Sequence, residues 1–486
     1  MKRKYITLTT LIIAFLGMIS CEDILNVKQE SYITSTEMWL SEEDAEAGMY
    51  GMYNRFRNAF SENYAYYGDY RSSLYGNGII DETNFVYMFN NTLTINTSGT
   101  NWVNFYTAIN DANLLLKHTP DITFGNDVKK NAVLANGYFV RAYTYFWLVR
   151  VFGDVPLVTE GFESDEQDLY PARTPASEVY AQIEADIIMA DNLMPEGIDS
   201  RIIANKAAVK MLMTDYYLWM AKTQGGGTDA LTKAKTSVNA VLGMSSSLEL
   251  QPDFSSVFYS EKNNEIILAL DFNNTEFTGG YPSVYLVPTQ YLTDKSYVEN
   301  PVRVGSHQEY VCVTEAYQNF LYSVPTDQRA WTSCAYFTDN VNNESFRWIN
   351  KYPGSWTDET RYFNSDIVLY RFAEALMFRA EIENALGFSD IAVGYLNDIA
   401  ERAYGIEDYY PASFSQEEVN DALIDEYKKE FVAEGKSWWV FQRFGVVYDM
   451  VTSLVGRENE HANMLLWPLA TATLSGNSNL VQTEGY

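Results

Sequence analysis

Histidine and cysteine are scarce in this chain of 486 residues, which contains three of each. The histidines (His118, His307 and His461) lie far apart, and no motif such as His-Glu-x-x-His occurs. Metal-dependent and Ser-His chemistry therefore lacks the residue pattern that it needs. Glycine and proline, with 28 and 13 residues, are too few for a collagen-like or low-complexity chain. The sequence predicts a globular protein without a metal site or a cofactor.

Basic residues are also few, since 34 Lys and Arg stand against 64 Asp and Glu and give a formal net charge of -30. Such a surface repels the phosphate backbone of nucleic acids, so we expect no nucleic-acid partner. Two of the many carboxylates could in principle serve a glycoside hydrolase, but the sequence singles out no pair for that role.

No internal apolar run is long enough to span a membrane, but the N-terminus has the pattern of a secretory signal. Basic residues 2–4 precede the mostly apolar residues 5–18, and Ser20-Cys21 resembles the bacterial lipoprotein box. Glu22 and Asp23 resemble the export signal of surface lipoproteins in Bacteroidetes-type bacteria. We expect a signal peptide at 1–20, a lipid anchor on Cys21, an extended leader over 21–40, and membrane contact through the anchor only. An ordinary signal peptide with an incidental Cys21 is the alternative.

The rest of the chain, 41–486, is interpreted as one domain of the mainly α class. Apolar residues recur at helical spacing over 41–60, 102–116, 128–152, 175–194, 205–220, 230–242, 366–386, 391–404 and 416–434. Successive helices form antiparallel pairs that resemble tetratricopeptide repeats, that is, an α-α superhelix. Residues 64–100 lack a helical period and are expected to form a long loop.

An irregular segment interrupts this scaffold, which we place at about 41–250 and 363–450. Residues 251–362, named the lobe, contain β-like runs at 265–271 and 281–287 between residues typical of turns. Cys312 and Cys334 lie in the lobe, and either a disulfide or two buried thiols fits an exported protein.

Three long motifs stand in the scaffold. They read RAYTYFWLVRVFGDVPLV at 141–158, LYRFAEAL at 369–376 and EFVAEGKSWW at 430–439. Tyr143, Phe146, Trp147 and Val151 fall at helical spacing, which predicts core packing rather than ligand contact. At least one of Trp438 and Trp439 is expected in the core. Arg443 and Glu434 form a buried ion pair in one interpretation and lie on a solvated helix face in another.

In this order, and with the ending NLVQTEGY, the motifs resemble the SusD/RagB family. The resemblance implies a lipoprotein exposed at the surface of the outer membrane, which works with a SusC-like TonB-dependent β-barrel transporter. It further implies a binding protein rather than an enzyme, and an oligosaccharide as the ligand. In some branches of the family the ligand is a peptide, and that alternative stays open beside the less favoured glycoside hydrolase.

Sugar rings stack on aromatic side chains, and their hydroxyls bond to polar groups, so non-helical segments rich in both types are the candidate binding regions. Two stretches qualify, 66–102 and 291–362. The candidate ligand-binding residues are Tyr70, Arg71, Tyr75, Asn77, Asp81, Tyr87, Asn101 and Trp102 in the first stretch and Trp331, Trp348, Tyr352 and Trp356 in the second. Structural roles compete with this: Trp102 and Trp331 as packing residues, and Arg71 as a partner of Asp69 or Asp81.

Overall fold

The computed structural model describes residues 38–260, 262–275, 280–288, 290, 308–339, 343–357 and 360–486. The expected signal peptide, the expected anchor cysteine Cys21 and nearly all of the expected leader lie outside these ranges. The helices are α3 (Glu42–Phe60), α4 (Asn63–Gly68), α5 (Thr83–Phe89), α6 (Val103–His118), α7 (Asp127–Phe152), α8 (Ala176–Leu193), α9 (Lys206–Thr223), α10 (Gly227–Leu242), α11 (Ser256–Tyr259), α12 (Glu315–Leu321), α13 (Arg329–Ser333), α14 (Phe372–Ala385), α15 (Ser389–Tyr404), α16 (Gln416–Glu430), α17 (Ser437–Phe444), α18 (Val447–Met450) and α19 (Thr471–Gly476).

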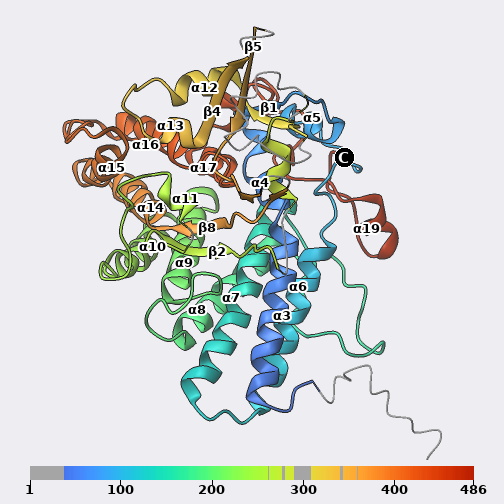
Figure 1. Ribbon diagram of the computed structural model, residues 1–486. Coiled ribbons are helices and arrows are strands. Elements are labelled where there is room, and N and C mark those ends of the chain that lie inside the picture. Colours follow the sequence, from blue (N-terminus) through green and yellow to red (C-terminus); the bar gives the residue numbers. More distant parts are fainter. Residues whose placement is uncertain are drawn as a thin grey trace, which may run out of the picture.

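The helices pack in pairs, as the sequence predicts. The pairs are α3 with α6, α7 with α8, α9 with α10, and α14 with α15. Figure 1 shows α3, α6 and α7 side by side, with the pairs that follow stacked beside them. This confirms a mainly α fold of tetratricopeptide-like helix pairs. Of the helices that the structure describes, none is both long and apolar enough to cross a membrane.

Side-chain caps fix where several helices begin. Ser41 accepts the backbone N–H of Asp44, whose carboxylate accepts the backbone N–H of Ser41 in return, so α3 starts with a complete capping box. Ser415 and Glu418 repeat this arrangement at the start of α16. Asn205 caps α9 in the simpler one-sided manner. These polar residues directly before apolar periods explain why the sequence locates the helix starts well.

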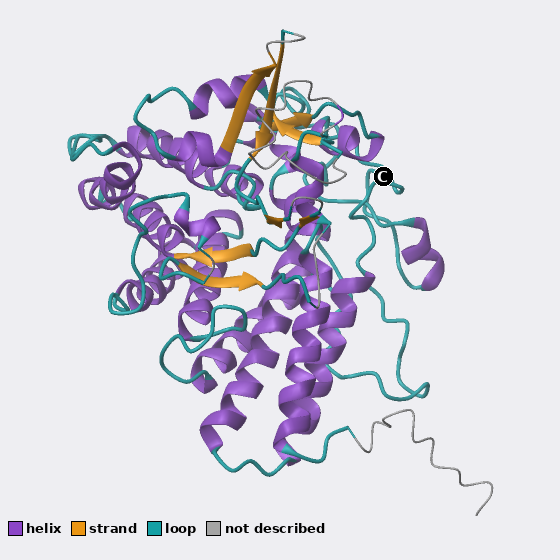
Figure 2. Cartoon of the chain, in the orientation of Figure 1, coloured by secondary structure: helices purple, strands orange, loops and turns teal. Residues whose placement is uncertain are grey.

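The strands are short. They are β1 (Tyr75–Asn77), β2 (Ile266–Leu270), β3 (Val311–Val313), β4 (Cys334–Asp339), β5 (Glu344–Ile349), β6 (Ser355–Trp356), β7 (Arg361–Tyr362) and β8 (Ile367–Arg371). Within the described ranges they form four two-stranded antiparallel sheets, β1-β3, β2-β8, β4-β5 and β6-β7. Figure 2 shows these pairs dispersed among helices rather than joined in one sheet. The lobe is therefore irregular, with local hairpins, as expected.

Three expectations about local structure are wrong. The expected loop 64–100 contains α4, β1 and α5. The expected strand at 281–287 is a 3-10 helix over Tyr281–Tyr285, because Pro282 fixes a helical φ at its start and Ser283 donates to the carbonyl of Gly280. The expected helix at 366–386 begins with β8, because pairing with β2 overrides the local preference of that segment.

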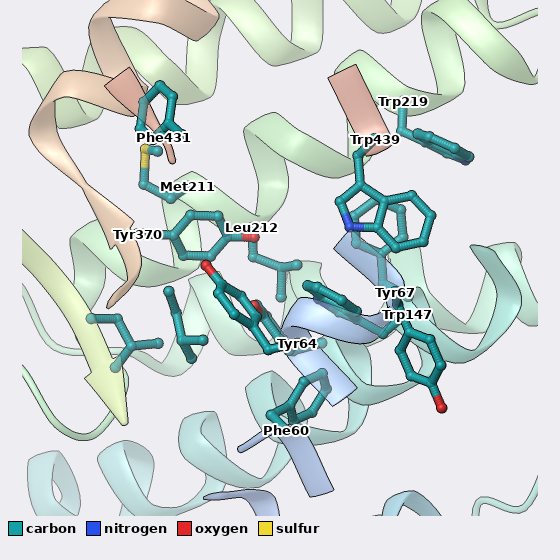
Figure 3. Packing of buried hydrophobic residues seen from close by; sticks show 14 of the residues in the cluster. Phe60, Tyr64, Tyr67, Trp147, Met211, Leu212, Trp219, Tyr370, Phe431 and Trp439 are labelled. Carbon is teal, nitrogen blue, oxygen red and sulfur yellow. The ribbon is translucent and has the colours of Figure 1, made fainter. Parts of the chain in front are cut away.

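Aromatic residues of the motifs form the centre of the core (Figure 3). Trp147 packs edge-to-face on Phe60, with ring centroids 5.4 Å apart, and on Trp439, also at 5.4 Å. Edge-to-face contacts of this kind add stability beyond burial of apolar area. Trp438 and Trp439 are both buried, so the prediction of core packing is confirmed for both tryptophans as well as for Tyr143, Phe146, Trp147 and Val151.

The motifs also supply a network of buried charges beneath the lobe. Arg371 of LYRFAEAL bonds to Glu434 at 2.8 and 2.9 Å and to Glu430 at 2.6 Å, and both glutamates belong to EFVAEGKSWW. Arg371 also donates to the carboxylate of Glu265 at 2.8 Å. Lys351 of the lobe donates to Glu434 at 2.6 Å. These side chains are almost entirely buried, so the network joins three distant segments of the chain.

Arg443 and Glu434 do not pair with each other. Arg443 donates to both carboxylate oxygens of Glu381, at 3.0 and 2.9 Å, because α17 lays it against α14. Glu434 lies beyond the end of α16 and forms ion pairs with Arg371 and Lys351. The predicted ion pair is therefore wrong in its partners. The two side chains are nevertheless buried, and each is paired with an opposite charge.

The two cysteines of the lobe are free thiols, and both are buried. Burial raises the pKa of Cys334 to about 12 and that of Cys312 as well, so neither is a reactive thiolate at neutral pH. Of the two open alternatives, the structure has the buried thiols.

A turn between α16 and α17 holds three parts of the molecule together. Ala433, with φ +57°, donates its N–H to the hydroxyl of Tyr75 at 2.7 Å. Its carbonyl oxygen accepts the hydroxyls of Tyr352 at 2.7 Å and Tyr281 at 3.1 Å. Asp69 accepts the N–H of Gly435 at 2.7 Å. The turn thus fastens the lobe and the segment after α4 to the C-terminal helices.

The close approach of α4 to this turn requires glycine at position 68. A Cβ on Gly68 would lie 2.0 Å from the carbonyl oxygen of Gly435, and backbone atoms cannot swing aside as a side chain can. We expect Gly68→Ala to lower the free energy of unfolding by about 2 kcal/mol, measured by urea denaturation. Gly51→Ala is the matched control, because a Cβ there meets nothing within 4 Å on an exposed part of α3. It should leave stability unchanged or raise it by up to about 1 kcal/mol, and equal losses in both variants would contradict the prediction.

Buried carboxyl groups of two kinds give stability an unusual pH dependence. Burial, partly opposed by hydrogen bonds from the backbone, raises the pKa of Asp69 to about 7, and burial raises the pKa of Glu374 to about 7. Burial opposes ionisation of Glu430 and Glu434 too, but the surrounding cations prevail and lower the pKa of both groups.

Between about pH 4 and 7 the folded state therefore binds protons at Asp69 and Glu374 that the unfolded chain has released, so stability falls as pH rises. Below the ordinary glutamate pKa, stability instead falls as pH falls, because the unfolded chain binds protons at Glu430 and Glu434 that the folded state does not bind. We expect the melting temperature to peak at about pH 5 and to fall on both sides. Asp69→Asn should flatten the fall on the alkaline side, and a melting temperature that rises steadily from pH 5 to 8 would refute the account.

Candidate ligand-binding site

Three exposed aromatic side chains surround a hollow of about 530 Å³ in the lobe. Tyr259, Trp331 and Trp356 are 45%, 46% and 36% exposed, although side chains of this size are usually covered. The remaining lining residues are the buried Phe258 and a set of small or polar residues: Ser255, Thr332, Asn350, Pro353, Gly354, Ser355, Asn364 and Ser365. The hollow is therefore an open site with aromatic walls and uncharged polar groups between them.

Each aromatic side chain is fixed by its own anchor. Tyr259 ends α11 and donates its hydroxyl to the carbonyl of Asn350 at 2.8 Å. Trp331 lies on α13, next to the buried Arg329 that holds this short helix through ion pairs. Trp356 lies on β6, and the guanidinium of Arg361 on β7 is centred 4.6 Å from its ring centroid. Anchored rings are already in place for a ligand, which reduces the entropy cost of binding.

Polar groups lie between these rings. Asn350 is oriented by two bonds, from Trp348 Nε1 to its Oδ1 at 3.2 Å and from its Nδ2 to the carbonyl of Trp331 at 3.3 Å. The hydroxyl oxygen of Ser355 is buried and has no hydrogen-bond partner among the residues that the structure describes. A buried polar atom without a partner is unfavourable, and a ligand hydroxyl reaching it would remove that penalty.

Trp331 and Trp356 are thus brought together as the sequence analysis proposed, whereas the other two candidates of the lobe are not. Trp348 and Tyr352 are each 1% exposed. The indole of Trp348 packs on Trp331 from inside, and the hydroxyl of Tyr352 is used by Ala433. Both side chains pack beneath the hollow, and neither offers a surface to a ligand.

Three candidates of the early stretch are buried as well. The hydroxyl of Tyr70 bonds to that of Tyr285, and Tyr75 holds Ala433. Arg71 is fully buried, and it donates to Asn91 at 2.7 Å and to the carbonyl of Met464 at 2.7 Å. The suggested pairing of Arg71 with Asp69 or Asp81 is therefore wrong. The guanidinium instead ties this segment to the C-terminal part of the chain, so these side chains are core residues.

The remaining early candidates lie away from the aromatic hollow, four of them at the surface and Trp102 buried. Asn77 is exposed and lines a second, more polar hollow of about 390 Å³ together with Tyr75. Asp81 is exposed and Tyr87 half-buried. Asn101 is exposed and accepts the N–H of Val103 at 2.9 Å, while Trp102, only 5% exposed, lines a separate apolar groove of about 440 Å³. The early stretch does not contribute to the aromatic hollow.

Tyr259 is the exposed aromatic residue of the hollow that sequence reasoning missed, as it also missed the polar lining residues such as Asn350, Ser355 and Asn364. It lies in the lobe but ahead of residue 291, where the second candidate stretch begins. The available signal was an aromatic pair, Phe258-Tyr259, between serines in a segment full of turn residues, because such a short helical turn can bury one ring and expose the next.

Two models of known protein families match this chain. Residues 23–218 match a family model described as starch-binding and associating with the outer membrane, and residues 331–486 match the model of the SusD family. The chain belongs to the SusD/RagB family. The second match begins at Trp331 and includes Trp356, whereas Tyr259 lies between the two matched regions.

Individual SusD proteins match this chain over most or all of its length. SusD-like protein P38 of Formosa agariphila is 26% identical over an alignment that covers both chains completely. The starch-binding protein SusD of Bacteroides thetaiotaomicron is 24% identical over 78% of this chain and 76% of its own. Among solved structures, NanU of B. fragilis superposes with a TM-score of 0.82 at 26% identity, covering 95% of this chain and all of that one. The whole scaffold, rather than one segment, is thus shared with SusD proteins.

Proposed function

We propose that this protein is a binding lipoprotein, exposed at the cell surface, that captures oligosaccharides in the aromatic hollow and delivers them to a SusC-like TonB-dependent β-barrel transporter. The observation that carries the proposal is the exposure of Tyr259, Trp331 and Trp356 around one hollow. Pyranose rings have apolar faces that stack on such rings, and the hydroxyls at their edges reach amide and hydroxyl groups such as Asn364 and Ser355.

The anchor supports the location. Cys21 follows a segment with the pattern of a secretory signal, and the family whose model matches residues 23–218 is described as associating with the outer membrane. Two or more acyl chains on one cysteine provide stable attachment without a spanning helix. Figure 1 shows α12, β4 and β5 of the lobe at the end of the molecule opposite the start of α3, so a protein tethered through its N-terminus can hold this part of the lobe away from the membrane.

The first test is a binding screen of the full-length protein in detergent against plant, microbial and host polysaccharides and a peptide mixture. We expect saturable binding to at least one glycan and none to peptides. Binding to peptides alone would replace the proposed ligand by the alternative one. Release of reducing sugar from a bound glycan, abolished by one carboxylate substitution, would instead identify a glycoside hydrolase.

The transporter is tested separately. A tagged form of the full-length protein, purified from outer membranes of its native host, should copurify with a β-barrel protein of the SusC type. Recovery without any barrel, with the protein free in the periplasm, would contradict both the partner and the location.

A further inference from the structure

The chemistry of the aromatic hollow restricts the sugars that it can take. No Lys, Arg, His, Asp or Glu is found among the described residues that line it. The phenol of Tyr259 is neutral at physiological pH, as an ordinary tyrosine is, and partial removal of its hydroxyl from water, with the nearby Asp253, raises its pKa further. A ligand in the hollow therefore meets aromatic faces, amides and hydroxyls only.

Two cations that contact residues lining the hollow, Arg361 and Lys351, also make contacts inside the protein. Arg361 lies against the ring of Trp356 and donates to the carbonyl of Pro353. Lys351 lies below Phe258, with its ammonium nitrogen 4.6 Å from that ring centroid, and it donates to Glu434 at 2.6 Å. Both side chains are buried and neither lines the hollow, so they present no exposed positive charge to an anion there.

A negative charge lies at the edge of the hollow. Ser255, which lines the hollow, donates its hydroxyl to the exposed Asp253 at 2.9 Å, so a carboxylate lies at its edge. The whole chain carries a formal net charge of -30. A carboxylated or sulfated sugar would therefore lose hydration in the hollow without gaining a counter-charge, and it would approach against a repulsive field.

We infer that the aromatic hollow binds neutral oligosaccharide and discriminates against sugar units that carry carboxylate, sulfate or phosphate groups. This rests on the function proposed above and narrows its ligand class. The stacking surfaces supply affinity, and the lack of an accessible cation beside them supplies the discrimination.

The experiment compares matched probes by isothermal titration calorimetry on the full-length protein in detergent. Neutral gluco-, xylo-, manno- and galacto-oligosaccharides are each paired with a sulfated or uronate-bearing counterpart of the same backbone. At least one neutral probe should bind, and its acidic counterpart should have an affinity at least about tenfold lower. Raising the salt concentration should reduce this difference in affinity only in part, because salt screens the repulsion but supplies no counter-charge in the hollow. Binding confined to acidic probes would overturn the inference and leave glycan capture standing, whereas no saturable binding by any probe would count against the proposed function itself.

A variant with a cation in the hollow tests the reason for the discrimination. Asn364→Arg places a positive charge among the lining residues, and Thr232→Arg adds the same charge on an exposed, remote part of α10. The first variant should raise the affinity for the acidic probe about tenfold, and the second should leave it within about twofold. An equal gain in both would show that net charge, rather than the lining of the hollow, sets the preference.

Discussion

Replacing Arg371 by methionine should lower the free energy of unfolding by about 3–5 kcal/mol, the largest loss of stability expected for a single substitution in this protein. Arg371 is fully buried and holds the carboxylates of Glu265, Glu430 and Glu434 at hydrogen-bond distance. Methionine fills much of the same volume but removes the one cation that all three carboxylates share, leaving Arg402 to Glu265 and Glu430 and Lys351 to Glu434. The measurement is urea denaturation followed by circular dichroism.

Arg457→Met is the matched control for this loss. Arg457 also makes a two-pronged ion pair, with Glu460 at 2.8 Å, but both side chains are partly exposed. Exposed pairs of this kind contribute at most about 1 kcal/mol, and Nη1 of Arg457 also donates to the carbonyl groups of Ser453 at 3.0 Å and Asn91 at 3.3 Å, bonds worth about 1 kcal/mol each. The control should therefore lose clearly less stability than Arg371→Met. If both variants lost the same stability, the buried network would have no special role.

The double substitution Trp331→Ala and Trp356→Ala should weaken glycan binding by at least about 100-fold. Each tryptophan offers an exposed face to the hollow, and central aromatic residues of binding sites commonly contribute about 2 kcal/mol each. Because both rings are substantially exposed, we expect the melting temperature to change little. Isothermal titration with the glycan found in the screen measures the affinity, and a thermal melt confirms that the variant is folded.

Tyr170→Ala serves as the control for exposed aromatic surface. Tyr170 is 55% exposed on a loop outside the hollow, so its removal should leave glycan affinity unchanged. Unaltered binding in the folded double variant would move the site elsewhere, to the polar hollow at Asn77 in the first instance.

The sequence predicts the helical scaffold well, since its helices carry apolar periods and polar caps such as those at Ser41 and Ser415. It fails where long-range pairing decides local structure. Residues 367–371 precede a strong helix and read as its first turn, yet they pair with β2 from about a hundred residues earlier. No local pattern records such a partner.

The binding site was predictable in its region and partly in its residues. Tryptophans in an irregular segment are candidates for ligand contact, but sequence alone cannot say which ring is exposed. Trp331 and Trp348 are both in the lobe and their rings touch, yet one is 46% exposed and the other 1%. Arg71 was misjudged for a similar reason, because the carbonyl groups that it meets belong to residues almost four hundred positions away.

The turn at Ala433 also bears on how the chain reaches its final shape. Asp69 and Gly435, which bond there, are separated by 366 residues, and Tyr75 and Ala433 by 358. Closing a loop of this length costs more conformational entropy than pairing neighbouring helices, so a contact so far apart in the chain forms late. The helices α3, α6 and α7 can pair locally first, while the segment around Asp69 stays exposed until its partner arrives. Burial of the Asp69 carboxyl is therefore a late folding event, and a chain that stops before Gly435 has no means of completing it.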